Sequence, residues 1–472
     1  MAVSACTDDP LGTDDAVALG EMVRAGQVSA AELLEAAIAR AEAVNPDLNA
    51  VAVWDLDRAR TKASSATGDG VFAGVPTFYK GVSNYEGLPN RFGSRAVPDT
   101  PATDMSPGLE QLGSTGVVPL GLTTSPEFGL TATTENSLTG VTRNPWSLEH
   151  SSGGSSGGSA AMVAAGVVPI AHANDGGGSI RIPASCCGLV GLKSTRDRML
   201  GDPLPGIFPI NPGVEGMVSR TVRDTAAYLH AAEQFHPAPN LPPVGHVTEP
   251  IADRLRVGVI LEGSDGVAYD SAVTAEVHRV AALLEDLGHQ VEIVPNPFDT
   301  SVTDDFLMVW CLLPFLAWHG GKRVFGKDFD REQMQPFAKH LKDHFRRNLH
   351  TTRGAFKRVK QFAADFPKIY ADHDVLLAPT LGGPCHRIGY LDPELPGEVQ
   401  IERSRRQVPT TWHHNAGGGP AISLPLATDA TGLPMGMHFS ANMGQEATLL
   451  ALALELEQAH PWPTLAEDGP TR

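Results

Sequence analysis

Apolar patterns with helical spacing and with strand spacing alternate along most of this 472-residue chain. Near the N-terminus, Ser29 and Glu32 have the spacing of a capping box at the start of a helix, which Asn45-Pro46 is expected to end. Strand patterns occur at 50–53, 74–78, 117–121, 375–379, 421–426 and 435–440. This alternation predicts an α/β fold.

The region between about residues 295 and 372 is mostly helical in pattern. We expect it to be a helical insertion in a single domain that spans residues 1–472, because no polar stretch is long enough to be a linker. Its bulky aromatic residues favour an ordinary helix core, although they could also shape a substrate pocket. These residues are Phe306, Trp310, Phe315, Trp318, Phe337 and Phe345.

Charge and composition exclude several classes of protein. The net charge of -18 would repel a phosphate backbone, so nucleic acid is not an expected partner. Five cysteines, with no CxxC pair, are too few for a disulfide framework and indicate a reducing, cytoplasmic location. No window of about 18 uncharged apolar residues occurs, so we expect no membrane association.

A glycine- and serine-rich stretch occupies residues 151–159, with the sequence SSGGSSGGS. Residues 153–157 match the G-x-S-x-G pattern of a nucleophile elbow, with Ser155 in the serine position. That elbow needs an apolar strand before it, whereas residues 144–150 carry proline and charge. A serine esterase that uses Ser155 and a histidine therefore remains an alternative hypothesis only.

A second glycine cluster, Gly176 to Gly178, stands directly before Ser179. Consecutive glycines allow several backbone N–H groups to converge on one point, as a developing oxyanion requires. A serine beside such a site still needs a base, and none of the 17 histidines has a recognisable triad context. The chain lacks a P-loop, an HExxH motif and a cysteine–histidine cluster, so we expect neither metal nor organic cofactor.

Several segments together resemble the amidase signature family. The segments are AGVPTFYKG at 73–81, TRNPW at 142–146, GGSSGGSAAMVAAG at 153–166, NDGGGSIRIPASCCGLVGLK at 174–193 and GPAISLP at 419–425. Their order and their long intervals also match the family, so the resemblance covers nearly the whole chain. It implies a large mixed β-sheet with helices on both faces.

The resemblance implies a Ser–Ser–Lys triad in place of Ser–His–Asp. Ser179 would attack the carbonyl carbon of the substrate. Ser155, joined to Gly154 by a cis peptide bond, would link the hydroxyl of Ser179 to the amine of Lys80. Burial can bring a lysine pKa down to about 7–8, which suits a base that works near neutral pH.

Further roles also come from the resemblance. The backbone N–H groups of Gly176, Gly177, Gly178 and Ser179 would form the oxyanion hole. Ser156 would support the relay by hydrogen bonding. Asp175 and Arg181, which flank the glycine loop with opposite charges, are expected to brace it rather than to act chemically.

The chain departs from the family pattern at two places. It has Ala173-Asn174-Asp175 where the family commonly shows Gly-Thr-Asp, and Ser194 where the family has proline. We expect neither departure to touch a proposed catalytic group. The Asn-Asp variant resembles the branch with hydrolases of nylon-derived cyclic amide dimers, whereas Ile182 argues against a tRNA-dependent amidotransferase subunit.

The sequence thus predicts an amidase that cleaves a small-molecule amide to acid and amine through an acyl-enzyme on Ser179. The enzyme alternative is the Ser155 esterase. The non-enzyme alternative is a binding subunit that kept the fold and lost turnover, against which the intact Lys80, Ser155 and Ser179 speak. Residues near Trp412 are expected to help build the substrate pocket. A homodimer is the expected oligomeric state from the frequency of such assemblies alone.

Overall fold

The computed structural model describes residues 2–263, 266–298 and 300–465. An eight-stranded sheet runs through the molecule in the order β12-β11-β13-β15-β14-β9-β10-β8. Strand β11 is parallel to β12 and β13, and the other neighbouring pairs are antiparallel, so the sheet is mixed. Its strands are β8 (Ile170–Asp175), β9 (Val190–Lys193), β10 (Val214–Ser219), β11 (Arg256–Ile260), β12 (Gln290–Val294), β13 (Val375–Pro379), β14 (Ala421–Thr428) and β15 (Pro434–Ala441).

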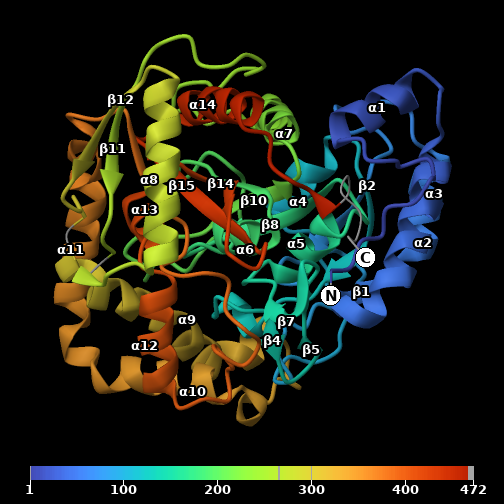
Figure 1. The fold of residues 1–472 in the computed structure, drawn as a ribbon. Helices are drawn as coiled ribbons and strands as arrows, with labels where there is room; N and C mark the ends of the chain where they lie inside the picture. The colour runs from blue at the N-terminus through green and yellow to red at the C-terminus, as the bar shows by residue number, and fades with distance from the viewer. Residues whose placement is uncertain (1, 264–265, 299, 466–472) are drawn as a thin grey trace.

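Helices cover both faces of this sheet (Figure 1). On one face, α7 (Val222–Phe235), α8 (Ser271–Asp286) and α14 (Glu446–Ala459) bury their apolar sides against the strands. On the other face, α5 (Gly157–Ala164) and α6 (Arg181–Cys187) contact the strands. All residues of α5 and α6 are buried. The predicted α/β fold, with a large mixed sheet between helices, is confirmed.

A smaller sheet lies beside β8, in the order β1-β3-β2. It consists of β1 (Val51–Trp54), β3 (Val118–Thr123) and β2 (Pro76–Lys80). Helices α2 (Ala30–Leu48) and α3 (Leu56–Ser64) cover it, with α1 (Ala16–Arg24) at the molecule's edge and α4 (Pro107–Gly113) nearby (Figure 1). Because β2 contacts β8, the last residue of β2, Lys80, is brought against the C-terminal end of β8.

The capping box at the start of α2 forms as predicted, with Ser29 and Glu32 bonded to each other's backbone N–H groups. The predicted end at Asn45-Pro46 is wrong, because α2 continues through Pro46 to Leu48. A proline close to a helix end costs only one backbone hydrogen bond. The helix ends at Asn49, which takes a left-handed conformation with φ 51° and donates its N–H to the Asn45 carbonyl.

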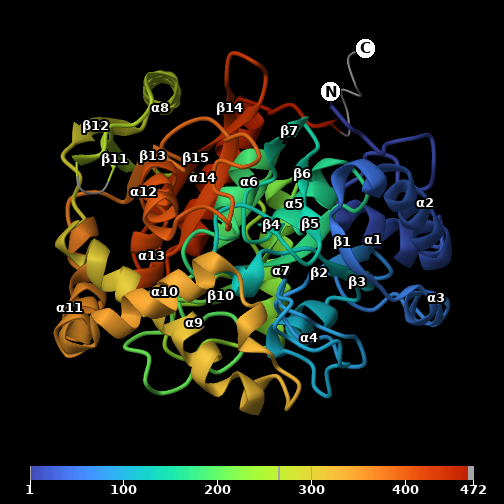
Figure 2. The ribbon, with the colours of Figure 1, turned by 90° about the horizontal axis from the view of Figure 1, so that it is seen from below.

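Residues after β12 are helical as predicted, with α9 (Thr303–Val324), α10 (Pro336–Arg347) and α11 (Thr352–Asp365). They lie together with α12 (Gly397–Gln407) and α13 (Trp412–Gly417) at one side of the molecule (Figure 2). That this segment is an insertion into one domain stays a prediction. Among the described helices, none combines the length and apolar character needed to cross a membrane.

Candidate active site

Lys80 is fully buried at the end of β2, and its amine is surrounded by oxygen atoms. The Nζ atom lies 2.7 Å from Oγ of Ser155 and 2.6 Å from Oδ1 of Asn174. The backbone carbonyl of Asn174 is 3.3 Å away. Burial lowers the pKa of Lys80 to about 7, even though Glu215 and Asp175 act in the opposite direction. A substantial fraction of this lysine is therefore neutral near pH 7 and able to accept a proton.

Ser155 lies in the loop between β7 (Ser147–Ser151) and α5. The Gly154–Ser155 peptide bond is cis, as the resemblance implied. Position 154 must be glycine, since a Cβ there would lie 2.6 Å from the backbone nitrogen of Thr133. A short strand does precede this loop, but β7 forms a two-stranded hairpin with β6 (Arg143–Asn144) and a bridge from His150 to Arg387, and it is not a strand of the central sheet.

Ser179 lies in the loop between β8 and α6, and only 7% of its surface is exposed. Gly178 before it has φ +131°, and a Cβ there would lie 2.3 Å from Oγ1 of Thr411. Thr411 in turn donates its hydroxyl to the carbonyl of Gly177, at 2.6 Å. The glycines thus allow the loop to pass against α13, where no side chain would fit.

Asp175 and Arg181 hold this loop at both ends. Two hydrogen bonds of 2.9 and 3.0 Å join their side chains, which are both fully buried. Burial alone would raise the pKa of Asp175, but the charge and hydrogen bonds of Arg181 hold that pKa well below its usual range. Asn415 donates to Asp175 as well, at 2.9 Å. This arrangement agrees with a bracing role.

The four proposed oxyanion-hole residues are not equivalent. The N–H of Gly178 donates to Oδ1 of Asp175 at 2.6 Å, so this amide already has an acceptor. Gly177 and Ser179 line a cavity, whereas Gly176 and Gly178 do not. The ring of Trp310 covers the loop, 3.3 Å from the Cβ position of Gly176 and 3.7 Å from that of Gly177.

Ser156 contacts the relay indirectly. Its hydroxyl donates to the Asn174 carbonyl at 3.3 Å, and the same carbonyl also lies 3.3 Å from Lys80 Nζ. Ser156 therefore shares an acceptor with Lys80. In this way it helps to fix the backbone of β8 beside the amine.

The expectation that the Asn174 departure touches no catalytic group is wrong. The side chain of Asn174 is bonded to Lys80 itself. Alternation along β8 explains why. Side chains two residues apart, such as 172 and 174, share one side of the strand, and both of these residues contact Lys80 on β2. Ser194, the second departure, has only its backbone carbonyl near a lysine, 2.8 Å from Lys193.

Two further residues near Lys80 were not found from the sequence. His172 accepts the backbone N–H of Lys80 through Nδ1, at 3.3 Å. Its other ring nitrogen is 2.8 Å from a carboxylate oxygen of Glu215. When His172 is neutral, Nε2 must therefore carry the proton and donate it to Glu215. The spacing of two between His172 and Asn174 was the signal that could have revealed this contact.

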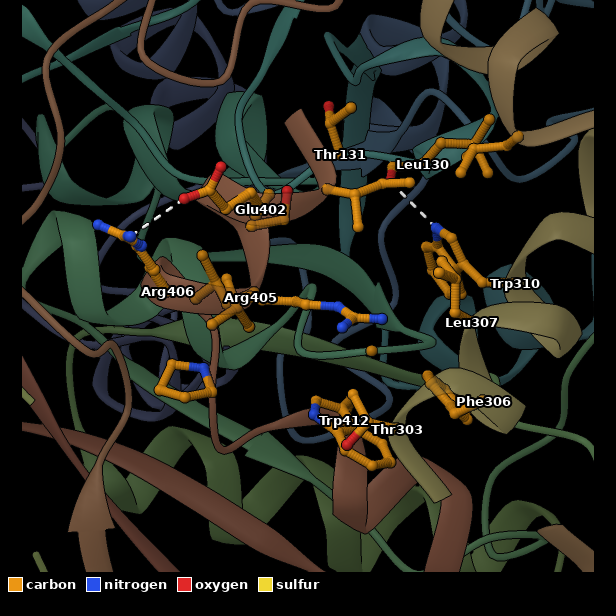
Figure 3. A pocket seen from close by; sticks show the side chains of 18 of the residues that line it. Leu130, Thr131, Thr303, Phe306, Leu307, Trp310, Glu402, Arg405, Arg406 and Trp412 are labelled. Carbon is orange, nitrogen blue, oxygen red and sulfur yellow. Dashed lines mark hydrogen bonds and ion pairs between the residues drawn. The ribbon is translucent and has the colours of Figure 1, made fainter. Parts of the chain in front are cut away.

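A cavity of about 350 Å³ opens beside Ser179 (Figure 3). Three of the six aromatic residues singled out in the helical region line it, namely Phe306, Trp310 and Phe337. The other three, Phe315, Trp318 and Phe345, pack within the helices, where the rings of Phe315 and Phe345 have centroids 4.8 Å apart. Trp412 also lines the cavity, as expected. Both interpretations of the aromatic residues therefore apply, each to a different subset.

The sequence profile of the Amidase family matches residues 32–450 of this chain. The chain belongs to this family. A protein named "Putative amidase AmiC" from Mycobacterium tuberculosis is 44% identical, over 98% of this chain and 99% of that protein. The 6-aminohexanoate-cyclic-dimer hydrolase of a Pseudomonas species is 35% identical, over 95% of each chain.

Solved structures of amide-hydrolysing enzymes have the same fold as this chain. A 6-aminohexanoate cyclic dimer hydrolase matches the amidase with a TM-score of 0.87 at 31% identity, over 97% of this chain and 98% of that chain. A bacterial aryl acylamidase matches with a TM-score of 0.85 at 26% identity, over 96% and 97%. The protein is an enzyme that hydrolyses the carbon–nitrogen bond of an amide.

The esterase alternative is not favoured. The hydroxyl of Ser155 is bonded to Lys80, whereas an esterase of that type needs a histidine as its base. Within the described ranges, no histidine nitrogen lies in hydrogen-bonding distance of Ser155 or Ser179. Ser155 is therefore paired with a lysine rather than with a histidine.

Proposed function

We propose that Ser179 is the nucleophile of this amidase and that Ser155 and Lys80 relay its protons. The observation that carries the proposal is the 2.7 Å contact between Lys80 Nζ and Ser155 Oγ, made by a lysine whose pKa burial lowers to about 7. The expected substrate is a small-molecule amide, which enters the cavity that Ser179 lines.

The relay accounts for each proton in the reaction. Neutral Lys80 accepts the proton of Ser155, Ser155 accepts that of Ser179, and Ser179 Oγ attacks the amide carbon. The oxyanion is stabilised by the amides of Gly177 and Ser179. As the tetrahedral intermediate collapses, Ser155 gives its proton to the departing nitrogen and regains one from Lys80. Water then attacks the acyl-enzyme through the same relay, and the acid leaves.

Three variants test this proposal: Ser179→Ala, Ser155→Ala and Lys80→Ala, measured on a panel of aryl and aliphatic amides. We expect Ser179→Ala to abolish turnover and the other two to reduce kcat by at least about 10²-fold. Matched controls are Ser64→Ala and Lys357→Ala, which change exposed residues on α3 and α11. Near wild-type turnover by Ser179→Ala would contradict the proposed nucleophile.

We also place the amidase in the cytoplasm. Its five cysteines are free thiols, four of them buried, which supports a reducing compartment. Fractionation of cells that make the protein at its natural level checks this location. Recovery of the amidase outside the cytoplasmic fraction would contradict it.

A further inference from the structure

Four aromatic rings, together with aliphatic side chains, form apolar walls of the cavity beside Ser179. Phe306 stacks on Trp412 with centroids 5.2 Å apart and planes at 25°, and on Trp310 with centroids 6.4 Å apart and planes at 29°. The one polar atom of the Trp310 ring donates to the Leu130 carbonyl, at 3.2 Å (Figure 3). These rings therefore offer the cavity extended apolar surfaces.

Among the residues that the structure describes, the charged ones that line the cavity all lie on α12, and each has an opposite charge beside it. Arg406 is 3.0 Å from Glu402, which also lines the cavity (Figure 3). Arg405 forms an ion pair with Asp304, at the start of α9. Both pairs are largely exposed to solvent, so a charged substrate group would have to pass them and enter the apolar space beyond unpaired, which is costly.

The positions of the two serines indicate which half of the substrate enters the cavity. Ser179 lines the cavity, whereas Ser155 lies beyond it, against Lys80. Under the proposed relay, Ser155 gives its proton to the departing nitrogen, so the amine must face Ser155. The acyl group then points the other way, into the aromatic cavity.

We propose that the amidase acts on neutral amides with an apolar acyl group, either aromatic or an alkanoyl chain of about six carbons or more. The apolar walls, the paired charges and the volume of about 350 Å³ support this substrate class. The proposal rests on the function proposed above, because it takes Ser179 as the nucleophile.

The test uses p-nitroanilides with acyl groups from acetyl to octanoyl, together with benzoyl and the anionic succinyl. Each buried methylene contributes about 0.8 kcal/mol, so kcat/KM is expected to rise about fourfold per methylene, and roughly 10²-fold from acetyl to hexanoyl. Succinyl anilide is expected to be at least tenfold poorer than butanoyl anilide. Phe306→Ala should lower the hexanoyl-to-acetyl ratio at least fivefold, whereas the control Trp318→Ala, on the same helix outside the cavity, should leave it unchanged.

A flat chain-length series, or a preference for the succinyl anilide, would overturn this substrate class. So would a protein that hydrolyses none of the anilides although a fluorophosphonate still labels Ser179. A protein that is not labelled at Ser179 would instead contradict the proposed function. The two failures are therefore distinguishable.

An independent observation concerns the amine of Lys80. Three oxygen atoms surround it: Ser155 Oγ at 2.7 Å, Asn174 Oδ1 at 2.6 Å and the Asn174 carbonyl at 3.3 Å. Both oxygens of Asn174 can only accept hydrogen bonds, whereas the hydroxyl of Ser155 can also donate one. A neutral amine has two hydrogens and one lone pair. When the hydrogens bond to Asn174, the lone pair is left facing the Ser155 hydroxyl.

We infer that Asn174 is a positioning residue that aims the lone pair of Lys80 at Ser155. The backbone of Asn174 is itself fixed, because β8 pairs with β10 at Glu215 and Ser156 donates to the Asn174 carbonyl. The side-chain oxygen is thus held at a defined place beside the amine. Without it, the amine can rotate and the hydroxyl loses its acceptor.

The test compares Asn174→Leu and Asn174→Asp by kcat/KM as a function of pH. Asn174→Leu removes the acceptor, and we expect a loss of at least tenfold at every pH. Asn174→Asp keeps an acceptor but adds a negative charge beside the amine, which favours ammonium, so its activity should appear at least one pH unit higher than in wild type. Asn442→Asp, in the loop after β15, where the side chain contacts the Pro367 carbonyl and not Lys80, is the control for added charge.

A purely structural role of Asn174 would lower activity or thermal stability without moving the pH profile of the aspartate variant. An unshifted profile in Asn174→Asp, or wild-type kcat/KM in Asn174→Leu, would overturn the inference. Melting temperatures of both variants separate a misfolded protein from a folded one with a misdirected base. If Asn174→Leu does not fold, the profile of Asn174→Asp decides alone.

Discussion

Lys80 Nζ lies 2.7 Å from Ser155 Oγ, and the two side chains are 0% and 2% exposed. Both groups of this contact are therefore shielded from bulk water. Under the proposed relay, the protonation state of this one lysine controls turnover. The proposal therefore predicts how the activity depends on pH.

Activity should rise with pH through the pKa of Lys80. Only neutral Lys80 accepts a proton, and its pKa lies at about 7, so kcat/KM for a neutral amide is expected to rise tenfold per pH unit below 7 and to level above about 8. Lys80→Arg stays charged at all these pH values and should be inactive throughout. A wild-type profile that is flat between pH 5.5 and 8 would contradict this assignment.

Stability should also respond to this lysine. Lys80 has a pKa of about 7 when folded and an ordinary value near 10.5 when unfolded. Between these values the unfolded chain binds more protons, so the free energy of unfolding contributed by Lys80 increases with pH. Relative to Lys80→Met, wild type should therefore gain about 2 kcal/mol between pH 7 and 9. Denaturant titrations of both proteins at these two pH values measure it.

The ion pair under the glycine loop should be needed for stability. Asp175→Asn leaves the guanidinium of Arg181 buried without its counterion and is expected to cost about 3–5 kcal/mol in unfolding free energy. The double variant Asp175→Asn/Arg181→Met should lose less than the single variant, because no charge is left unpaired. Equal or greater loss in the double variant would show that the unpaired charge is not the cause.

A methyl group at position 178 should disturb the nucleophile loop. Gly178→Ala forces an unfavourable φ of +131° on alanine and brings its Cβ within 2.3 Å of Thr411 Oγ1. We expect kcat to fall at least about 10²-fold, because Ser179 and its amide move together with the loop. The matched control is Gly320→Ala on α9, where a Cβ has nothing within 4 Å. Similar activity of both variants would contradict a tightly fitted loop.

Much of the fold followed from local sequence patterns. Strand β13 has the predicted bounds, and β14 and β15 contain the predicted segments 421–426 and 435–440, because continuous apolar runs mark buried strands. The end of α2 was mispredicted, since the proline rule ignores how little a proline costs in a last helical turn. No sequence pattern comparable to Asn45-Pro46 indicated that the helix would end at the left-handed Asn49.

The candidate site could be predicted only in part, for a physical reason. The serines and the lysine lie in segments whose glycines are locally recognisable. Contacts between strands that are far apart in the sequence cannot be recognised from local patterns. Asn174 contacts Lys80 across 94 positions. Glu215 lies near the site because its strand, β10, pairs with β8. Trp310 covers the glycine loop from a helix more than 120 residues further along the chain. Such contacts depend on the tertiary fold.

The most direct test of the account is the site of covalent trapping. The purified amidase is treated with a fluorophosphonate, digested, and the labelled residue is identified by mass spectrometry. The account predicts a label on Ser179, with no labelling of Ser179→Ala and weakened labelling of Lys80→Ala, since the base activates the nucleophile. A label on Ser155 that persists in Ser179→Ala would contradict the central claim and make Ser155 the nucleophile.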